Sequence, residues 1–166
     1  MMFLNSNGIN IRDSFFYDNR ADNGGGAMLL NTCDGVLITN AIFSGNIGSS
    51  GAAIDAKLSI INCHNALFVG NVGSDVVNRA QDGRDVAAFM ANFNHCTFAA
   101  NKAHRAILHR PARRKQYYSN LIITGQYVPV YFSAEYGETI LSNCWWNAMC
   151  ESTREVLKTT GIAPEM

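Results

Sequence analysis

The segment NTCDGVLITNAIFSGNIGSSGAAIDAK, residues 31–57, contains one complete unit of a pattern that recurs along the chain. Its apolar residues fall in three short runs, at 36–38, 41–43 and 52–54, and corners rich in Gly, Asn and Ser separate these runs. Short apolar runs between such corners are typical of β-strands joined by turns. Three strands within 27 residues indicate one coil of a solenoid, not a hairpin or a βαβ unit.

The recurrence is clearest for one apolar anchor residue in each unit. The anchors follow one another at intervals of 23 to 30 residues and are Phe16, Phe43, Phe68, Phe98, Ile123 and Trp146. Stacked coils place equivalent residues about 4.8 Å apart, so the anchors are expected to form a column inside the fold. Six anchors predict about six coils.

Two polar positions accompany each anchor. Three residues after it an amide side chain recurs, at Asn19, Asn46, Asn71, Asn101 and Gln126. Stacked amides can donate hydrogen bonds from one coil to the next, so this series predicts a structural ladder. Three residues before the anchor stand Asp13, Asn40, Asn65, His95, Asn120 and Asn143. Asn and Asp tolerate the left-handed backbone conformation, so we expect a bend at this position in every coil.

The pattern divides the 166-residue chain into two parts. Residues 1–151 alternate with the period of two that strands impose, and they form the predicted coils. Within 152–166, the residues from Ser152 to Glu155 form a capping box, which predicts a short C-terminal capping helix followed by a tail. The coil pattern is already present at residues 7–11 without a comparable cap, so we expect N-terminal coils of a longer chain to precede it.

Charge is unevenly distributed along a chain whose formal net charge is zero. Between residues 86 and 134 there are six basic residues and no acidic ones. The N-terminus has no cationic segment followed by a long apolar run, so no signal peptide is visible. No later stretch is apolar enough to predict a transmembrane segment.

Two of the units resemble the repeats of a known group of proteins. Phe16 and Asn19 are followed by GGAM at 25–28, and Phe43 and Asn46 by GAAI at 51–54. This pairing is similar to the polymorphic outer-membrane protein and adhesin type of repeat, within the right-handed parallel β-helices of the pectate-lyase-like superfamily. The resemblance covers about residues 8–150. It implies an all-β, right-handed, single-stranded parallel β-helix, extracellular or at the cell surface, but it selects no activity, because the superfamily contains enzymes, adhesins and phage proteins.

Carboxylates do not recur at matching positions of successive coils. Asp55, for example, has no acidic counterpart at its own position. A Ca²⁺ site needs several converging oxygen ligands and glycoside hydrolysis needs two placed carboxyls, so the predicted strands supply neither. The expected loop at 74–85 does gather Asp75, Asp82 and Asp85, of which the last two are candidate ligand-binding residues. A charged, solvated loop is the alternative interpretation.

A basic loop insertion is predicted at about residues 109–116, where Pro111 and a cationic cluster have to leave the stack. Its candidate ligand-binding residues, with one that precedes it, are Arg105, His109, Arg110, Arg113, Arg114 and Lys115. Their charges fit an anionic polysaccharide or cell-surface glycan, and a solvated insertion without a ligand is the alternative. Nucleic acid is not expected, because only Tyr117 and Tyr118 lie beside the run and the core series includes Tyr118.

The histidines and cysteines lack the spacing of a metal site, and we predict neither a metal nor a cofactor. Cys33, Cys63, Cys96 and Cys144 are expected to be small buried apolar residues. Cys144 with Cys150 is the one local pair that we expect to be able to form a disulfide.

These observations predict a non-catalytic surface segment of the adhesin type that binds an anionic polysaccharide. The alternative is a fragment of a carbohydrate-active β-helix enzyme, either a polysaccharide lyase or a glycoside hydrolase. Its catalytic residues would lie in the loops or outside this chain.

Overall fold

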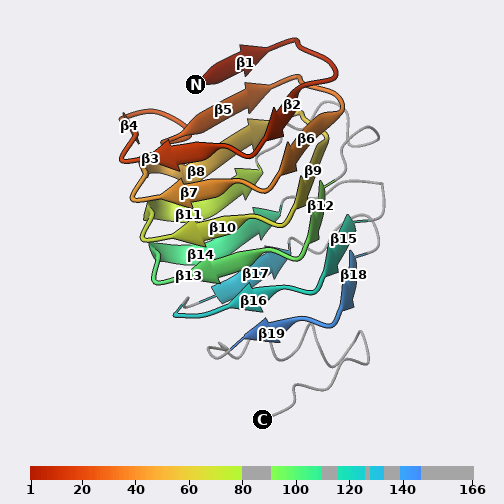
Figure 1. Cartoon of the computed structure of the whole chain (residues 1–166). Helices are drawn as coiled ribbons and strands as arrows, with labels where there is room; N and C mark the ends of the chain where they lie inside the picture. Colours follow the sequence, from red (N-terminus) through yellow and green to blue (C-terminus); the bar gives the residue numbers. More distant parts are fainter. Residues whose placement is uncertain (80–90, 110–115, 126–127, 133–138, 147–166) are drawn as a thin grey trace.

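The chain folds as a parallel β-solenoid, and Figure 1 shows its strands stacked in ranks from the N-terminus downward. The computed structural model describes residues 1–79, 91–109, 116–125, 128–132 and 139–146. Among these residues there is no helix, and the strand pairings are parallel, so the predicted all-β parallel β-helix is confirmed. The helix predicted within 152–166 lies outside the described residues. The described part of the chain contains no helix that is long and apolar enough to cross a membrane.

Three sheets form the sides of the solenoid. The first contains β1 (Met2–Leu4), β4 (Arg20–Ala21), β5 (Met28–Asn31), β8 (Ile47–Lys57), β11 (Val72–Arg79), β14 (Lys102–His109) and β17 (Val128–Phe132). The second contains β2 (Asn10–Arg12), β6 (Val36–Thr39), β9 (Ile61–His64), β12 (Ala91–Asn94), β15 (Gln116–Ser119) and β18 (Thr139–Ser142). The third contains β3 (Phe15–Tyr17), β7 (Ile42–Ser44), β10 (Leu67–Val69), β13 (Thr97–Ala99), β16 (Ile122–Ile123) and β19 (Trp145–Trp146).

The number of coils is slightly lower than the prediction of about six. About four coils are enclosed between a neighbour above and a neighbour below. The strands β1, β2 and β3 form one outer rank of the described chain, and β17, β18 and β19 form the other. Residues in these outer ranks lack a neighbouring coil on one side, so the fully buried core lies in the ranks between them.

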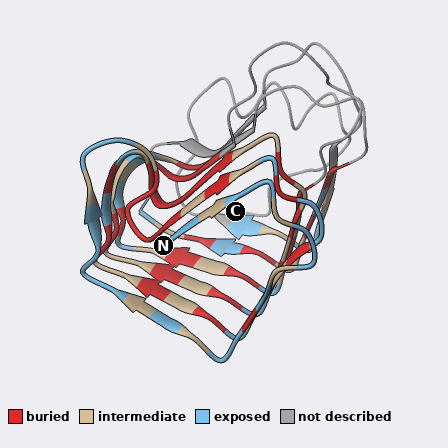
Figure 2. Ribbon diagram, turned by 90° about the horizontal axis from the view of Figure 1, so that it is seen from above, coloured by how far each residue is buried: buried red, intermediate tan, exposed pale blue. Residues whose placement is uncertain are grey.

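The anchor residues form the predicted column inside the third sheet. The rings of Phe16, Phe43, Phe68 and Phe98 stack face to face, with successive centroids 4.7, 4.9 and 4.5 Å apart and interplanar angles of 4–5°. Ile123 pairs with Phe98 and extends the column. Figure 2 looks down the stack, and its buried residues recur at the same places from coil to coil. Burial of these large side chains supplies much of the driving force for the fold.

The predicted bend occurs in every coil. The residues three before each anchor have φ between 48° and 54°, and they are Asp13, Asn40, Asn65, His95, Asn120 and Asn143. This conformation ends one strand and turns the chain into the next sheet, and Asn and Asp adopt it at lower cost than most residues. Several of these side chains also bond along the stack, which the sequence analysis did not predict: Asn40 Nδ2 donates to Asp13 Oδ1, and Asn65 Nδ2 donates to Asn40 Oδ1, both at 2.9 Å.

The predicted ladder is confirmed at Asn19, Asn46, Asn71 and Asn101, whereas Gln126 lies outside the described residues. Asn71 illustrates the pattern. Its Nδ2 donates to Asn101 Oδ1 and to the carbonyl of Phe43, both at 2.9 Å. Its Oδ1 accepts from the backbone N–H and from Nδ2 of Asn46, both at 3.0 Å. Because all four bonds are made inside the protein, an amide can be buried here without an unsatisfied group.

The cysteines in the described chain carry free thiols. Cys33, Cys63 and Cys96 are buried, as predicted, and Cys144 is half-buried. The sulfur atoms of Cys63 and Cys96 lie 3.8 Å apart, a contact between neighbouring coils that the sequence analysis did not predict. Cys150 lies outside the described residues, so its pairing with Cys144 stays a prediction.

Candidate functional site

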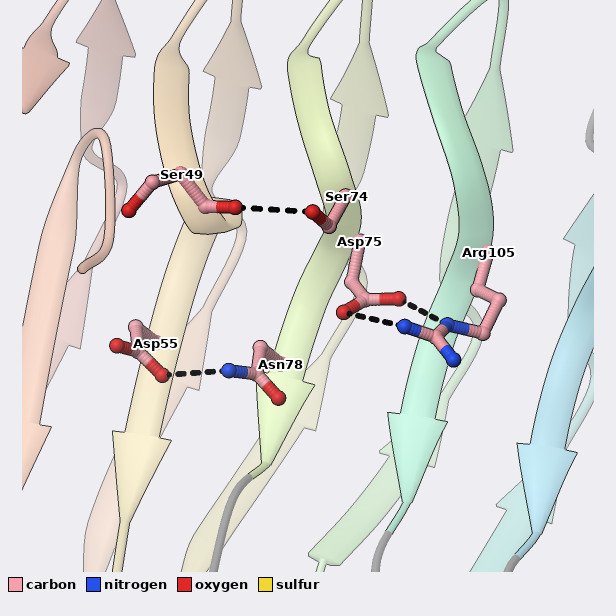
Figure 3. A network of polar contacts seen from close by, with 6 residues as sticks. All are labelled: Ser49, Asp55, Ser74, Asp75, Asn78 and Arg105. Atoms are coloured by element: carbon pink, nitrogen blue, oxygen red, sulfur yellow. Dashed lines mark hydrogen bonds and ion pairs between the residues drawn. The ribbon is translucent and has the colours of Figure 1, made fainter. Parts of the chain in front are cut away.

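Three neighbouring strands of the first sheet, β8, β11 and β14, carry a cluster of charged and polar side chains. The backbone register pairs Asp75 with Arg105 and Asn78 with Asp55. Ile54 and Val77 belong to the buried core. Because side chains alternate along a strand, Asp55 and Asn78 project from the opposite, outer face of the sheet. Figure 3 shows the members of this cluster on the three strands.

An ion pair joins β11 to β14. The guanidinium of Arg105 donates from Nε to Asp75 Oδ1 and from Nη2 to Asp75 Oδ2, the second bond measuring 3.2 Å. The Asp75 side chain is only 3% exposed and that of Arg105 is 25% exposed. Two parallel N–H···O bonds to a carboxylate are a strong and directional arrangement. Arg105 therefore compensates the charge of a carboxylate that the fold removes from water.

A second carboxyl group, that of Asp55, is buried without full compensation. Asn78 Nδ2 donates to its Oδ1 at 3.0 Å. Among the described residues none donates a hydrogen bond to its Oδ2, and the ammonium of Lys57 lies 4.0 Å from it. Burial raises the pKa of Asp55, an effect that Lys57 and Asn78 oppose and the charge of Asp75 reinforces. The group is consequently easier to protonate than an exposed aspartate.

The segment that precedes β5 closes over Asp55. A Cβ atom added at Gly24 would lie 3.4 Å from Asp55 Oδ2, and Gly24 has a φ of 93°. A side chain here would therefore be strained in its backbone as well as crowded. The backbone N–H of Gly24 donates to Ser49 Oγ at 3.1 Å, and Ser74 Oγ donates to the carbonyl of Ser49 at 3.0 Å. Hydrogen bonds thus connect this segment to β8 and β11.

The two carboxyl groups of the cluster are enclosed. Asp55 is 0% exposed and Asp75 is 2% exposed. A polymer outside the protein cannot contact either carboxyl group while these residues stay covered. The described residues also contain no group of three or more His, Cys, Asp or Glu side chains that could hold a metal ion. The arrangement stabilises contacts between coils and keeps one proton-binding carboxyl inside the protein.

The structure corrects two sequence-based assignments. Asp75 was expected in a solvated loop at 74–85, but β11 continues to Arg79, so Asp75 is a buried strand residue. Arg105 was grouped with the basic loop insertion, but its position is within β14, where its guanidinium binds Asp75. The reason is the same in both cases: the strands of the first sheet extend beyond the repeat that the anchors define.

The other predicted site residues are not placed. His109 is the last residue of β14, and nothing is described of its side chain. Arg110, Arg113, Arg114, Lys115, Asp82 and Asp85 lie outside the described residues. Sequence reasoning missed the pairing of Asp55 with Asn78. The available signal was a carboxyl group within the run AAIDA at 52–56, since a charge inside a buried apolar run requires a partner.

Comparison of the chain with protein-family models, with curated proteins and with solved structures finds no match.

Proposed function

We propose that this chain is a non-catalytic surface segment of the adhesin type that binds an anionic polysaccharide. The observation that carries the proposal is the pairing of Arg79 with His109, the last residues of β11 and β14. These strands end at the two paired positions, directly before residues 80–90 and 110–115. The two segments therefore begin next to adjacent points of the first sheet.

The charge of the second segment supports a polyanion as the ligand. Residues 110–115 contain four cations, Arg110, Arg113, Arg114 and Lys115, and no acid. Guanidinium groups bind carboxylate and sulfate through paired hydrogen bonds. Arg105 does not belong to this set, since Asp75 already binds it.

The burial of the strand carboxylates supports a non-catalytic role. General acid–base catalysis requires a group within hydrogen-bond reach of the substrate. Asp55 and Asp75 are enclosed and hold their own strands together, so neither meets that requirement in the described structure.

Retention of the full chain on heparin and polygalacturonate columns tests the proposal. Replacement of Arg110, Arg113 and Arg114 by Ser is expected to abolish retention and to leave the melting temperature nearly unchanged. A matched control replaces Arg12, Arg20 and Lys102, three exposed cations on the described strands, by Ser. The two triple variants then have the same net charge. Retention of the wild type should fall steeply with salt, through screening and counterion release. Equal loss of retention in both triple variants would indicate a general charge effect and would overturn the assignment.

An enzyme of the polysaccharide lyase or glycoside hydrolase class is the second candidate, and one observation favours it. Asp55 combines a raised pKa with a position near a second carboxyl group, Asp75. In such enzymes the acid and the base are typically two carboxyl groups whose environments give them different pKa values. Incubation with polygalacturonate, alginate and sulfated glycans, followed by assays for reducing ends and unsaturated products, tests this candidate. Turnover that is lost in Asp55→Asn or Asp82→Ala would replace the first proposal.

A further inference from the structure

The outer face of the third sheet carries a row of mainly apolar residues, which we call the apolar strip. It consists of Phe15, Ile42, Leu67, Thr97, Ile122 and Trp145, each paired in register with the next. Phe15 is 63% exposed, Ile122 47% and Trp145 51%. The strip is therefore exposed toward its two ends, each with an aromatic ring, and half-buried at Ile42, Leu67 and Thr97 between them. Apolar residues on the outer face of a sheet are normally covered, so this surface requires an explanation.

A second row beside the strip is also uncharged. Tyr17, Ser44, Val69 and Ala99 lie two residues further along the same strands and are paired in register. The rings of Phe15 and Tyr17 lie 6.1 Å apart, so the first coil presents two aromatic surfaces together. Neither row contains a charged residue, and the acids Asp13 and Asp18 flank the strand of the first coil.

A ridge of amide side chains borders the strip on the side of the second sheet. The bend residues Asn40, Asn65, Asn120 and Asn143 form this amide ridge, two residues before the strip in four coils, and Asp13 and His95 occupy the same position in the other two. Asn143 Nδ2 donates to Asn120 Oδ1 at 3.3 Å, and Asn40 and Asn65 use one Nδ2 hydrogen each in bonds along the stack. A carboxamide has two N–H donors and two acceptor lone pairs, so each residue keeps hydrogen-bonding capacity toward solvent.

The dimensions of the strip argue against a second copy of the chain as its occupant. Six strands at about 4.8 Å and three residues at about 3.3 Å give a face of about 24 Å by 10 Å. Stable protein interfaces bury about 800 Å² on each partner, which is several times this footprint. A narrow, extended ligand fits the strip better than a folded protein surface does.

We infer that the apolar strip and the amide ridge bind an uncharged, extended polysaccharide chain laid along the solenoid axis. A pyranose ring has an apolar face that stacks on Phe15 and Trp145, and hydroxyl groups at its edge that can exchange hydrogen bonds with the amide ridge. Four coils repeat both surfaces at the strand spacing, so a polymer can meet them repeatedly. This inference shares with the proposed function only the class of ligand, because it uses a different face and no charge.

Affinity electrophoresis of the full chain through gels that contain hydroxyethyl cellulose, galactomannan or xylan tests the inference. We expect retardation by at least one of these polymers, with little dependence on salt. The double variant Phe15→Ala/Trp145→Ala should weaken it by at least about tenfold, since aromatic residues dominate contact energies. Both side chains are largely exposed, so the variant should fold, which circular dichroism checks.

Two controls separate the possible outcomes. Tyr117→Ala removes an aromatic ring that is 41% exposed on the second sheet, and it should leave the retardation unchanged. The Arg110/Arg113/Arg114→Ser variant should still bind the uncharged polymers even if it no longer binds the anionic polysaccharide. Each proposal can therefore fail without the other. Absence of retardation by all three polymers, or equal retardation of the Phe15/Trp145 variant, would overturn the inference. A wild-type dimer that this variant abolishes would instead assign the strip to self-association.

Discussion

Replacement of Asn71 by Ala is expected to destabilise the protein far more than removal of one hydrogen bond would. Asn71 is 0% exposed and makes four hydrogen bonds with three residues. Alanine would leave the backbone N–H of Asn46 and one hydrogen of Asn46 Nδ2 without partners. The carbonyl of Phe43 would lose the bond from Asn71 but would stay in the backbone pairing of β7 with β10. Asn101 Oδ1 would keep one bond, from the backbone N–H of residue 71.

The magnitude follows from these two orphaned donors. Each buried group that loses its partner costs about 1–3 kcal/mol, so two of them sum to about 2–6 kcal/mol. This is a large part of a total stability of about 5–15 kcal/mol. For a domain of this size the melting temperature should fall by about 5–20 °C.

Asn19 provides the matched control at the end of the same ladder. It is exposed, and its side chain only donates, to Asn46 Oδ1 at 2.9 Å and to the carbonyl of Tyr17 at 3.3 Å. Asn46 Oδ1 would keep the bond from the backbone of residue 19. Asn19→Ala should therefore cost about 1 kcal/mol or less. Urea denaturation followed by circular dichroism measures both variants. If the free energies of unfolding of the two variants differ by less than about 1 kcal/mol, the buried ladder does not stabilise the fold as argued.

Two further predictions concern the buried acid and the bend. Burial raises the folded-state pKa of Asp55, so the stability that this group contributes is present at low pH and is lost as pH rises through its folded pKa. Asp55→Asn should remove that loss, so the stability of the variant relative to the wild type should increase as the pH rises above about 4. A difference in urea midpoint that stays constant or decreases with pH would contradict a raised pKa of Asp55. At Asn65, where φ is 52°, valine should destabilise the protein by about 1–2 kcal/mol more than glycine does. Both substitutions remove the bond from Asn65 Nδ2 to Asn40 Oδ1, so equal thermal stability of the two would show that the left-handed conformation carries no cost here.

Much of the fold was predictable because its determinants are local and repeat. The apolar alternation, the bend residue and the amide at a constant distance from each anchor impose the same backbone path in each unit. Stacking then places Phe43 on Phe68 and Asn46 beside Asn71, as the spacing indicated. The candidate site was less accessible to this reasoning, since a charge of one sign does not recur at the positions of Asp55, Asp75 and Arg105. Asp75 and Arg105 each lie seven residues after an anchor, so the spacing does align them in neighbouring coils.

The solenoid, its column of aromatic rings and its amide ladder could all be predicted from the sequence, because each coil contains the anchor, bend and amide residues that direct its backbone. The environment of the non-repeating charges became clear only in the folded chain. Asp75 and Arg105 are 30 residues apart, the same interval as Phe68 and Phe98, so the spacing aligns them. Whether they lie in a loop or in a sheet depends on how far β11 and β14 extend together through hydrogen bonding between neighbouring coils. That extent is not a property of one coil, so a residue that reads as part of a charged loop in the sequence becomes part of a buried ion pair in the folded chain.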